Sequence, residues 1–219
     1  MSNQSIKAVL FDYGGVIAEE GFRNGLLAMA HEQGLDIDAT LNVAKQAVYD
    51  SGFVLGWGTA SEFWTIMREG CGLKGSDSVL TQRILEGFVL RPWIIELVQQ
   101  LHEQGYITGI LSDQTHWLDW LNERDHFYDV FDHVFNSYNM GKGKRDPGLF
   151  NDIAEQLVLS PAEILFVDDI ENNVARAQSA GWQTIHYMDK LSFLEMIDKL
   201  LLPGIQDSDN KASEPMPAS

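Results

Sequence analysis

Residues 9–17 read Val9-Leu10-Phe11-Asp12-Tyr13-Gly14-Gly15-Val16-Ile17, an apolar run that ends on one carboxylate and two glycines. The apolar part, Ile6 to Phe11, predicts a buried β-strand, and the glycines allow a tight turn directly after it. Open α/β sheets bind their ligands at the carboxyl ends of their strands. Asp12 is therefore placed to bind a cation or to attack an electrophile, although an aspartate that only caps the turn is an equally open interpretation.

The composition predicts a packed, strongly acidic domain. The chain has 219 residues, of which 45% are hydrophobic and 11% aromatic, enough for a domain with a substantial core. Acidic residues outnumber basic ones by 32 to 15, which gives a formal net charge of -17. Because such a charge repels nucleic acid and anionic membranes, we expect neither as a partner. An anionic substrate would need a local cation or a metal ion.

The single cysteine, Cys71, excludes an intrachain disulfide and fits a reducing compartment. Its apolar neighbours favour a small core residue over a nucleophile. The polar N-terminal residues 1–5 show no signal peptide, and no apolar run is long enough to span a membrane. We therefore expect a cytoplasmic protein.

The apolar periodicity divides the chain into two kinds of region. Between residues 19 and 90 it is helical, with predicted helices near 22–33, 37–50, 61–71 and 76–87. Afterwards helices and strands alternate, which is typical of a parallel sheet covered by helices on both faces. The predicted helices are 94–104, 117–124, 148–157, 172–180 and 191–201, and the predicted strands are 106–111, 133–135, 164–167 and 184–187.

This pattern predicts an α/β fold, namely a Rossmann-like three-layer core with a parallel sheet and an inserted all-α helical cap. Residues 1–18 and 91–203 would form the core, and residues 19–90 would form the cap. From residue 204 to 219 the composition turns to Ser, Asp, Asn, Pro and Lys, which is typical of a disordered tail.

Polar residues follow the ends of several predicted strands or precede a helix, and a parallel sheet brings such positions to one edge. They are Asp12, Ser112 with Asp113, Lys144, and Asp168 with Asp169. The carboxylates are hard oxygen ligands suited to Mg²⁺, and without a cation they would repel one another. Taken singly, each residue has a purely structural explanation. Ser112 and the Asp168–Asp169 pair could be caps, and Lys144 could be a surface residue with Lys142 as its competitor.

Taken together, these residues predict phosphoryl transfer. Asp12 would attack phosphorus, with Lys144 holding a phosphate oxygen. Ser112, Asp113 and the backbone amides of their turn would bind the phosphate group. The predicted partner is then a small phosphorylated metabolite.

The order of these motifs resembles the haloacid dehalogenase-like hydrolase superfamily over nearly the whole chain. The quoted stretches are Phe11-Asp12-Tyr13-Gly14-Gly15-Val16, Leu111-Ser112-Asp113, Lys144-Arg145-Asp146-Pro147 and Phe166-Val167-Asp168-Asp169, with Arg91-Pro92 at the return from cap to core. The resemblance implies an Mg²⁺-dependent hydrolase in which Asp12 is the nucleophile. It also implies that Asp12, the backbone carbonyl of Gly14, and Asp168 or Asp169 bind the metal.

Gly14 departs from the pattern of this superfamily's phosphatases, which carry an acid/base aspartate two residues after the nucleophile. Losing a positioned general acid typically costs about 10²–10⁴-fold in rate. Activity would then be lost, another group such as His116 would replace the aspartate, or the leaving group would need little protonation. A similar subgroup with Asp-x-Gly-[Asn/Gly]-Val includes sugar-1-phosphate phosphatases, so a phosphatase acting on sugar phosphates is the leading hypothesis.

Two alternatives stay open from the sequence. The first is a 2-haloacid dehalogenase, which needs no metal, so that the Asp168–Asp169 pair argues against it. The second is a binding or regulatory protein that keeps the fold without turnover, an interpretation that Gly14 favours. The predicted cap would determine specificity, and its candidate substrate residues are Phe22, Arg23, Trp57 and Trp64, with His116 from the core.

Overall fold

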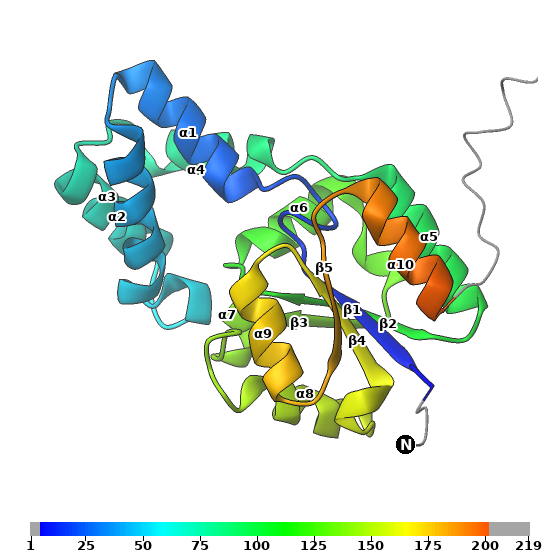
Figure 1. The fold of residues 1–219 in the computed structure, drawn as a ribbon. Coiled ribbons are helices and arrows are strands. Elements are labelled where there is room, and N and C mark those ends of the chain that lie inside the picture. Colours follow the sequence, from blue (N-terminus) through cyan, green and yellow to red (C-terminus); the bar gives the residue numbers. More distant parts are fainter. Residues whose placement is uncertain (1–4, 202–219) are drawn as a thin grey trace, which may run out of the picture. The chain divides into compact units, whose positions relative to one another are not determined.

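The computed structural model describes residues 5–201, and its centre is a five-stranded parallel sheet in the order β3-β2-β1-β4-β5 (Figure 1). The first strand pairs with β2 on one side and β4 on the other, and all of its residues are buried. The predicted parallel sheet is thus confirmed. The strands are β1 (Ala8–Phe11), β2 (Ile107–Ser112), β3 (His133–Asn136), β4 (Ile164–Asp168) and β5 (Gln183–His186).

Helices cover both faces of this sheet. Ala8 and Leu10 of β1 belong to a core cluster with apolar residues of α8 (Leu149–Leu157) and α9 (Glu171–Ser179), so these helices cover one face. The alternate residues of a strand face the other side. There α5 (Pro92–Glu103) contacts β2. The helix α6 (Trp117–Asp125) follows β2, and together these elements give the predicted three layers.

Four helices between β1 and α5 form the inserted block, here called the cap helices (Figure 1). The first packs mainly on the fourth and the second on the third. Gly25 permits the close approach of α1 to α4, because a Cβ there would lie 2.7 Å from the carbonyl oxygen of Arg83. The cap helices are α1 (Gly21–Gln33), α2 (Ile37–Asp50), α3 (Ala60–Cys71) and α4 (Asp77–Gly87), close to the predicted ranges.

Two antiparallel linkers connect the cap helices to the sheet. Ala18 and Leu90 form a bridge, and the Glu19 amide donates a hydrogen bond of 2.8 Å to the Val89 carbonyl. One residue further, the Arg91 amide donates to the Ile17 carbonyl at 2.9 Å. Hydrogen bonds therefore join the two linkers to each other, and they fix the position of Glu20, the N-cap residue of α1.

Among the described residues, four short helical elements were not predicted from the sequence, because a single turn is too short to show an apolar periodicity. They are α7 (Ser137–Met140) and 3₁₀ helices at Phe53–Leu55, Tyr128–Val130 and Pro161–Glu163. The last helix, α10 (Lys190–Leu200), belongs to a second unit that begins at Met188. The predicted tail at 204–219 lies outside the described residues. Within residues 5–201, no helix has the length and apolar character needed to cross a membrane.

Candidate active site

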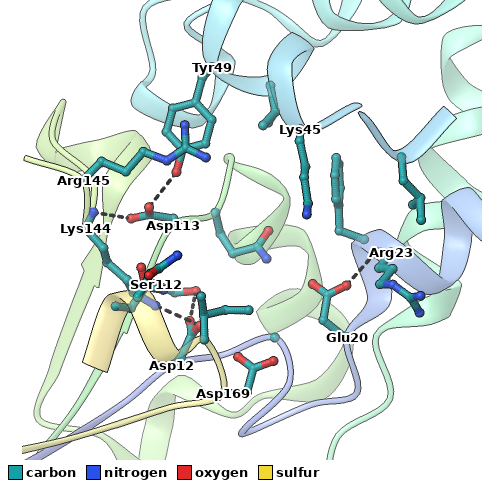
Figure 2. A pocket seen from close by; sticks show the side chains of 18 of the residues that line it. Asp12, Glu20, Arg23, Lys45, Tyr49, Ser112, Asp113, Lys144, Arg145 and Asp169 are labelled. Carbon is teal, nitrogen blue, oxygen red and sulfur yellow. Dashed lines mark hydrogen bonds and ion pairs between the residues drawn. The ribbon is translucent and has the colours of Figure 1, made fainter. Parts of the chain in front are cut away.

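The carboxyl end of β1 carries Asp12, a buried carboxylate whose two oxygens are both engaged (Figure 2). Its Oδ1 accepts hydrogen bonds of 2.7 Å from the Tyr13 amide and 2.7 Å from the Ser112 hydroxyl. Its Oδ2 lies 2.8 Å from the Lys144 ammonium. Since β1 and β2 are neighbours, the sheet itself brings Asp12 and Ser112 together, as their places at strand ends predicted.

Lys144 is the cation of this cluster. It is 1% exposed, and its Nζ lies 2.7 Å from Asp168 in addition to its contact with Asp12. Burial alone would lower the pKa of Lys144, but Asp12, Asp168 and Asp113 raise it above its usual value, so that the side chain stays charged. Lys142, the competing lysine, instead pairs with Asp152 at 2.5 Å near the surface.

Asp168 is the last residue of β4 and Asp169 follows it, and the two carboxylates have different environments. Asp168 is fully buried and accepts hydrogen bonds from Lys144, from the Ile170 amide at 2.7 Å and from Asn173 at 3.1 Å. Asp169, and not Asp168, is among the residues that line the adjacent cavity. Burial, and secondarily the charge of Asp168, raises the pKa of Asp169.

The three carboxylates have a donor set that fits a divalent cation. Oxygens of Asp12, Asp168 and Asp169 all lie within 4.8 Å of one another. The pKa of Asp12 is raised to about 8, chiefly by burial; Lys144 opposes this rise, and the charges of Asp168 and Asp169 contribute to it. One lysine does not balance three ionised carboxylates, and Mg²⁺ would neutralise the remaining negative charge through the hard oxygen ligands it prefers.

The two glycines after Asp12 allow the close approach of this cluster. Gly15 has a φ of +83°, and a Cβ there would lie 2.3 Å from an oxygen of Asp169. Arg91 donates a hydrogen bond to the Gly15 carbonyl and another of 2.9 Å to the Val16 carbonyl, so it holds the turn from the far linker. Gly14 lines the cavity, next to the nucleophile candidate.

Asp113 connects the sheet to the cap helices. Its Oδ1 accepts from the Lys144 amide at 2.8 Å, and its Oδ2 accepts from the Tyr49 hydroxyl of α2 at 2.8 Å. The guanidinium of Arg145 lies 3.7 Å from the centre of the Tyr49 ring, in cation–π contact. Figure 2 shows these three side chains together at one end of the site.

A cavity of about 700 Å³ lies between the strand ends and the cap helices. Its cap side combines apolar and cationic side chains, and only two of them, Phe22 and Arg23, were predicted from the sequence. The cap residues in its wall are Glu20, Phe22, Arg23, Leu26, Leu41, Lys45, Val48 and Tyr49, and the core adds Gln114, Arg145, Ile170, Asn172, Asn173 and Arg176 to the cluster already described.

The two tryptophan candidates and the histidine candidate for substrate binding are not part of this wall. Trp57 is 74% exposed, and Trp64 is buried, donating a 3.0 Å hydrogen bond to Thr81. The His116 ring packs edge-on against Trp120, with 4.7 Å between centroids, and burial lowers the pKa of His116. The suggestions that Trp57 and His116 bind substrate, or that His116 replaces an acid, gain no support from these positions.

Glu20 is the residue that the sequence analysis missed next to Gly14. It is the N-cap of α1, where its Oε2 accepts a 2.7 Å hydrogen bond from the Arg23 amide, while the side chain also lines the cavity. Burial raises the pKa of Glu20; the Arg23 amide opposes this effect. The acidic pair Glu19–Glu20 before a predicted helix was the one available signal, and it indicates only a cap.

Comparison with known proteins identifies the family. A family model for haloacid dehalogenase-like hydrolases matches residues 6–181. The sesquiterpene phosphatase astK of Aspergillus oryzae is 28% identical over 194 residues, which are 86% of this chain and 93% of that protein. The beta-phosphoglucomutase of Bacillus subtilis is 26% identical over 183 residues, 80% of each protein.

A solved structure gives the same result. The HAD family enzyme bt-2542 of Bacteroides thetaiotaomicron, in complex with magnesium and inorganic phosphate, has a TM-score of 0.63 at 25% identity, covering 87% of this chain and 99% of that one. The five-stranded parallel sheet and the helices described above agree with these matches. This chain belongs to the haloacid dehalogenase-like hydrolase family and is a hydrolase.

Proposed function

We propose that this protein is a Mg²⁺-dependent phosphatase that hydrolyses small phosphate monoesters through an aspartyl-phosphate on Asp12. The observation that carries the proposal is the buried triad in which the Lys144 ammonium lies 2.8 Å from Asp12 and 2.7 Å from Asp168. The Lys144 ammonium favours the ionised form of Asp12, against the burial that raises its pKa, and holds the carboxylate in place for attack. The phosphatase relative of Aspergillus oryzae supports the same chemistry.

The proposed reaction has two displacements at phosphorus. Asp12 forms a bond to phosphorus while the bond to the alcohol oxygen breaks, and water then attacks phosphorus and breaks the acyl-phosphate bond. Lys144 and the Ser112 hydroxyl, both within 2.8 Å of Asp12, bind phosphate oxygens. Asp113 contributes by fixing the Lys144 backbone and by closing the site against Tyr49.

Asp12, the backbone carbonyl of Gly14 and Asp169 would hold Mg²⁺, with Asp168 beside them. Asp169 is the better-placed member of its pair, because it faces the cavity whereas Asp168 is enclosed by Lys144, Asn173 and the Ile170 amide. When bound, the ion would neutralise the charge of the phosphoryl oxygens and orient the ester. The magnesium complex of the Bacteroides enzyme supports the choice of Mg²⁺ as the metal.

The proposed domain division follows the paired linkers. Residues 1–18 and 91–203 would be the catalytic core and residues 19–90 the cap, which would contribute α1 and α2 to the wall that excludes water and selects the ester.

Sugar phosphates are the leading substrate class. Arg23 and Lys45 of the cap wall could bind hydroxyl or anionic groups, and the phosphoglucomutase relative supports the choice. Phosphate esters of isoprenoid alcohols are a second class, because Phe22, Leu26 and Val48 give the same wall an apolar part and one relative is a sesquiterpene phosphatase.

The test is phosphate release from a panel of both ester classes, with Mg²⁺ or with chelator, by the native protein and by Asp12→Asn. The proposal expects Mg²⁺-dependent release that Asp12→Asn abolishes. Chloride release from 2-haloacids in chelator would instead indicate the dehalogenase alternative. Tight binding of inorganic phosphate without any hydrolysis would indicate a binding protein.

A further inference from the structure

We propose that Glu20 is the general acid and base of this hydrolase and acts from the space beside Gly14. The inference rests on the proposed phosphatase mechanism and adds to it the proton donor that Gly14 cannot supply. It makes Glu20 a catalytic residue contributed by the first residues of the cap.

Glu20 lies where the carboxyl group of an aspartate at position 14 would lie. An ideal Cβ on Gly14 would lie 3.4 Å from the Glu20 Oε1, 3.3 Å from the Phe88 ring and 3.7 Å from the Gln114 amide nitrogen. The carboxylate of an aspartate at position 14 would extend beyond that Cβ into the same part of the cavity. Of the three neighbours only Glu20 carries an exchangeable carboxyl proton.

The two oxygens of Glu20 have separate tasks, since Oε2 accepts from the Arg23 amide at 2.7 Å and Oε1 is the oxygen beside Gly14. The N-cap contact therefore fixes the carboxyl group without using the oxygen that would transfer the proton. Figure 2 shows Glu20 in the cavity together with Asp12 and Asp169.

The bridge between Ala18 and Leu90 and the Glu19–Val89 hydrogen bond end one residue before Glu20. Glu20 is thus anchored at the root of the cap, close to the sheet, whereas Lys45 and Tyr49 reach the cavity from α2. Because the paired linkers are held to the core, a side chain next to them keeps its position beside Gly14 better than one on a more distant part of the cap.

The proton balance of the two displacements is then complete. As Asp12 bonds to phosphorus and the ester bond breaks, the Glu20 carboxyl gives its proton to the departing alcohol oxygen. The resulting Glu20 carboxylate takes a proton from the water that attacks the aspartyl-phosphate. Phosphate leaves, and both Asp12 and Glu20 return to their starting states.

The experiment measures kcat/KM for substituted phenyl phosphates of increasing leaving-group pKa, together with the best alkyl ester of the panel. Glu20→Gln keeps an acceptor oxygen for the α1 N-cap but carries no transferable carboxyl proton. We expect little change for p-nitrophenyl phosphate and a loss of about 10²–10⁴-fold for the alkyl ester, which gives a steeper leaving-group dependence. With p-nitrophenyl phosphate the aspartyl-phosphate should also accumulate, because its formation needs no acid while its hydrolysis loses the base.

The matched control is Asp36→Asn, which makes the same change at the exposed N-cap of α2, where Asp36 accepts from the Ala39 amide at 2.7 Å. It should behave as the native protein. A double variant, Glu20→Ser with Gly14→Asp, should recover activity toward the alkyl ester, since the serine can still cap α1 and leaves room for the new carboxylate beside position 14.

The outcomes separate this inference from the proposed function. An unchanged leaving-group dependence in Glu20→Gln, or an equal loss for every ester, would overturn the role of Glu20 while Asp12→Asn stays inactive. A native protein that releases no phosphate from any ester would instead contradict the proposed function itself.

Discussion

Replacing Gly15 with alanine should displace one carboxylate of the proposed metal site while leaving the others in place. Gly15 has a φ of +83°, and its ideal Cβ would lie 2.3 Å from Oδ2, 2.4 Å from Cγ and 2.8 Å from Oδ1 of Asp169. No real side chain tolerates such contacts, so the Asp169 carboxylate must move out of the cluster. Asp12 and Asp168 would keep their contacts with Lys144.

Two effects of Gly15→Ala can be estimated separately. A non-glycine residue in the left-handed region costs roughly 1–2 kcal/mol, which lowers the free energy of unfolding. Loss of a well-placed group around a metal lowers affinity by about 10–100-fold, so the dissociation constant for Mg²⁺ should rise at least that much. The second effect corresponds to about 1.4–2.8 kcal/mol of binding free energy.

Gly105→Ala is the matched control. Gly105 has a φ of +86°, and a Cβ there would meet nothing within 4 Å. It therefore introduces the same backbone strain without touching the site. Calorimetric titration with Mg²⁺ and urea unfolding in chelator measure the two effects. If Gly15→Ala binds Mg²⁺ as tightly as Gly105→Ala does, Asp169 is not a metal ligand and the assignment fails.

Three further perturbations test the cluster. Lys144→Met leaves Asp12 and Asp168 buried without their cation, so urea unfolding in chelator should show a loss of about 3–5 kcal/mol, and a loss below about 1 kcal/mol would contradict the buried triad. Tyr49→Phe removes the hydrogen bond to Asp113 and should lower the free energy of unfolding by about 1 kcal/mol and raise KM; an unchanged KM would argue against a closed cap. The pKa of Asp12 is raised to about 8, chiefly by burial, so the folded metal-free protein holds a proton that the unfolded chain releases near pH 4. The melting temperature of the metal-free protein should therefore fall as the pH rises from 4 through 8. Mg²⁺ favours the ionised carboxylate, so it should raise the melting temperature more at pH 9 than at pH 6, and an equal gain at both would refute the linkage.

The sheet and its site could be predicted because both follow from local patterns. Alternation of apolar strands and helices defines a parallel sheet, and such a sheet brings residues at its carboxyl edge together whatever their separation in sequence. Asp12, Ser112 and Asp168 were found this way, and their strands are neighbours in the structure. The cap helices could equally be predicted, from their apolar periodicity and from the glycines that separate them.

The cap contribution to the site could not be predicted, because it depends on how two separate blocks meet. Tyr49 looks like an ordinary helix residue until α2 places its hydroxyl on Asp113. Glu20 looks like a cap residue, and only the linker geometry shows that its second oxygen lies beside Gly14. His116 carries suitable chemistry, but its ring packs on Trp120 instead of lining the cavity.

Lys144 was the candidate taken from the sequence, with Lys142 as its competitor in the same glycine-rich turn. The different contacts of the two lysines could not be predicted, because they depend on the fold. The Lys144 amide bonds to Asp113, which directs its side chain inward to Asp12, whereas Lys142 meets Asp152 near the surface. The hydrogen bond from the Lys144 amide to Asp113 thus directs Lys144, and not Lys142, into the site.

The most direct test of the account is to trap the covalent intermediate. Native protein would be mixed with Mg²⁺ and a radiolabelled ester from the panel, quenched in acid within the first turnovers, digested and mapped by mass spectrometry. Native protein should carry a hydroxylamine-labile phosphoryl group on the peptide that contains Asp12, and Asp12→Asn should carry none. Turnover of the ester with no label on Asp12, or with label on another residue, would contradict it.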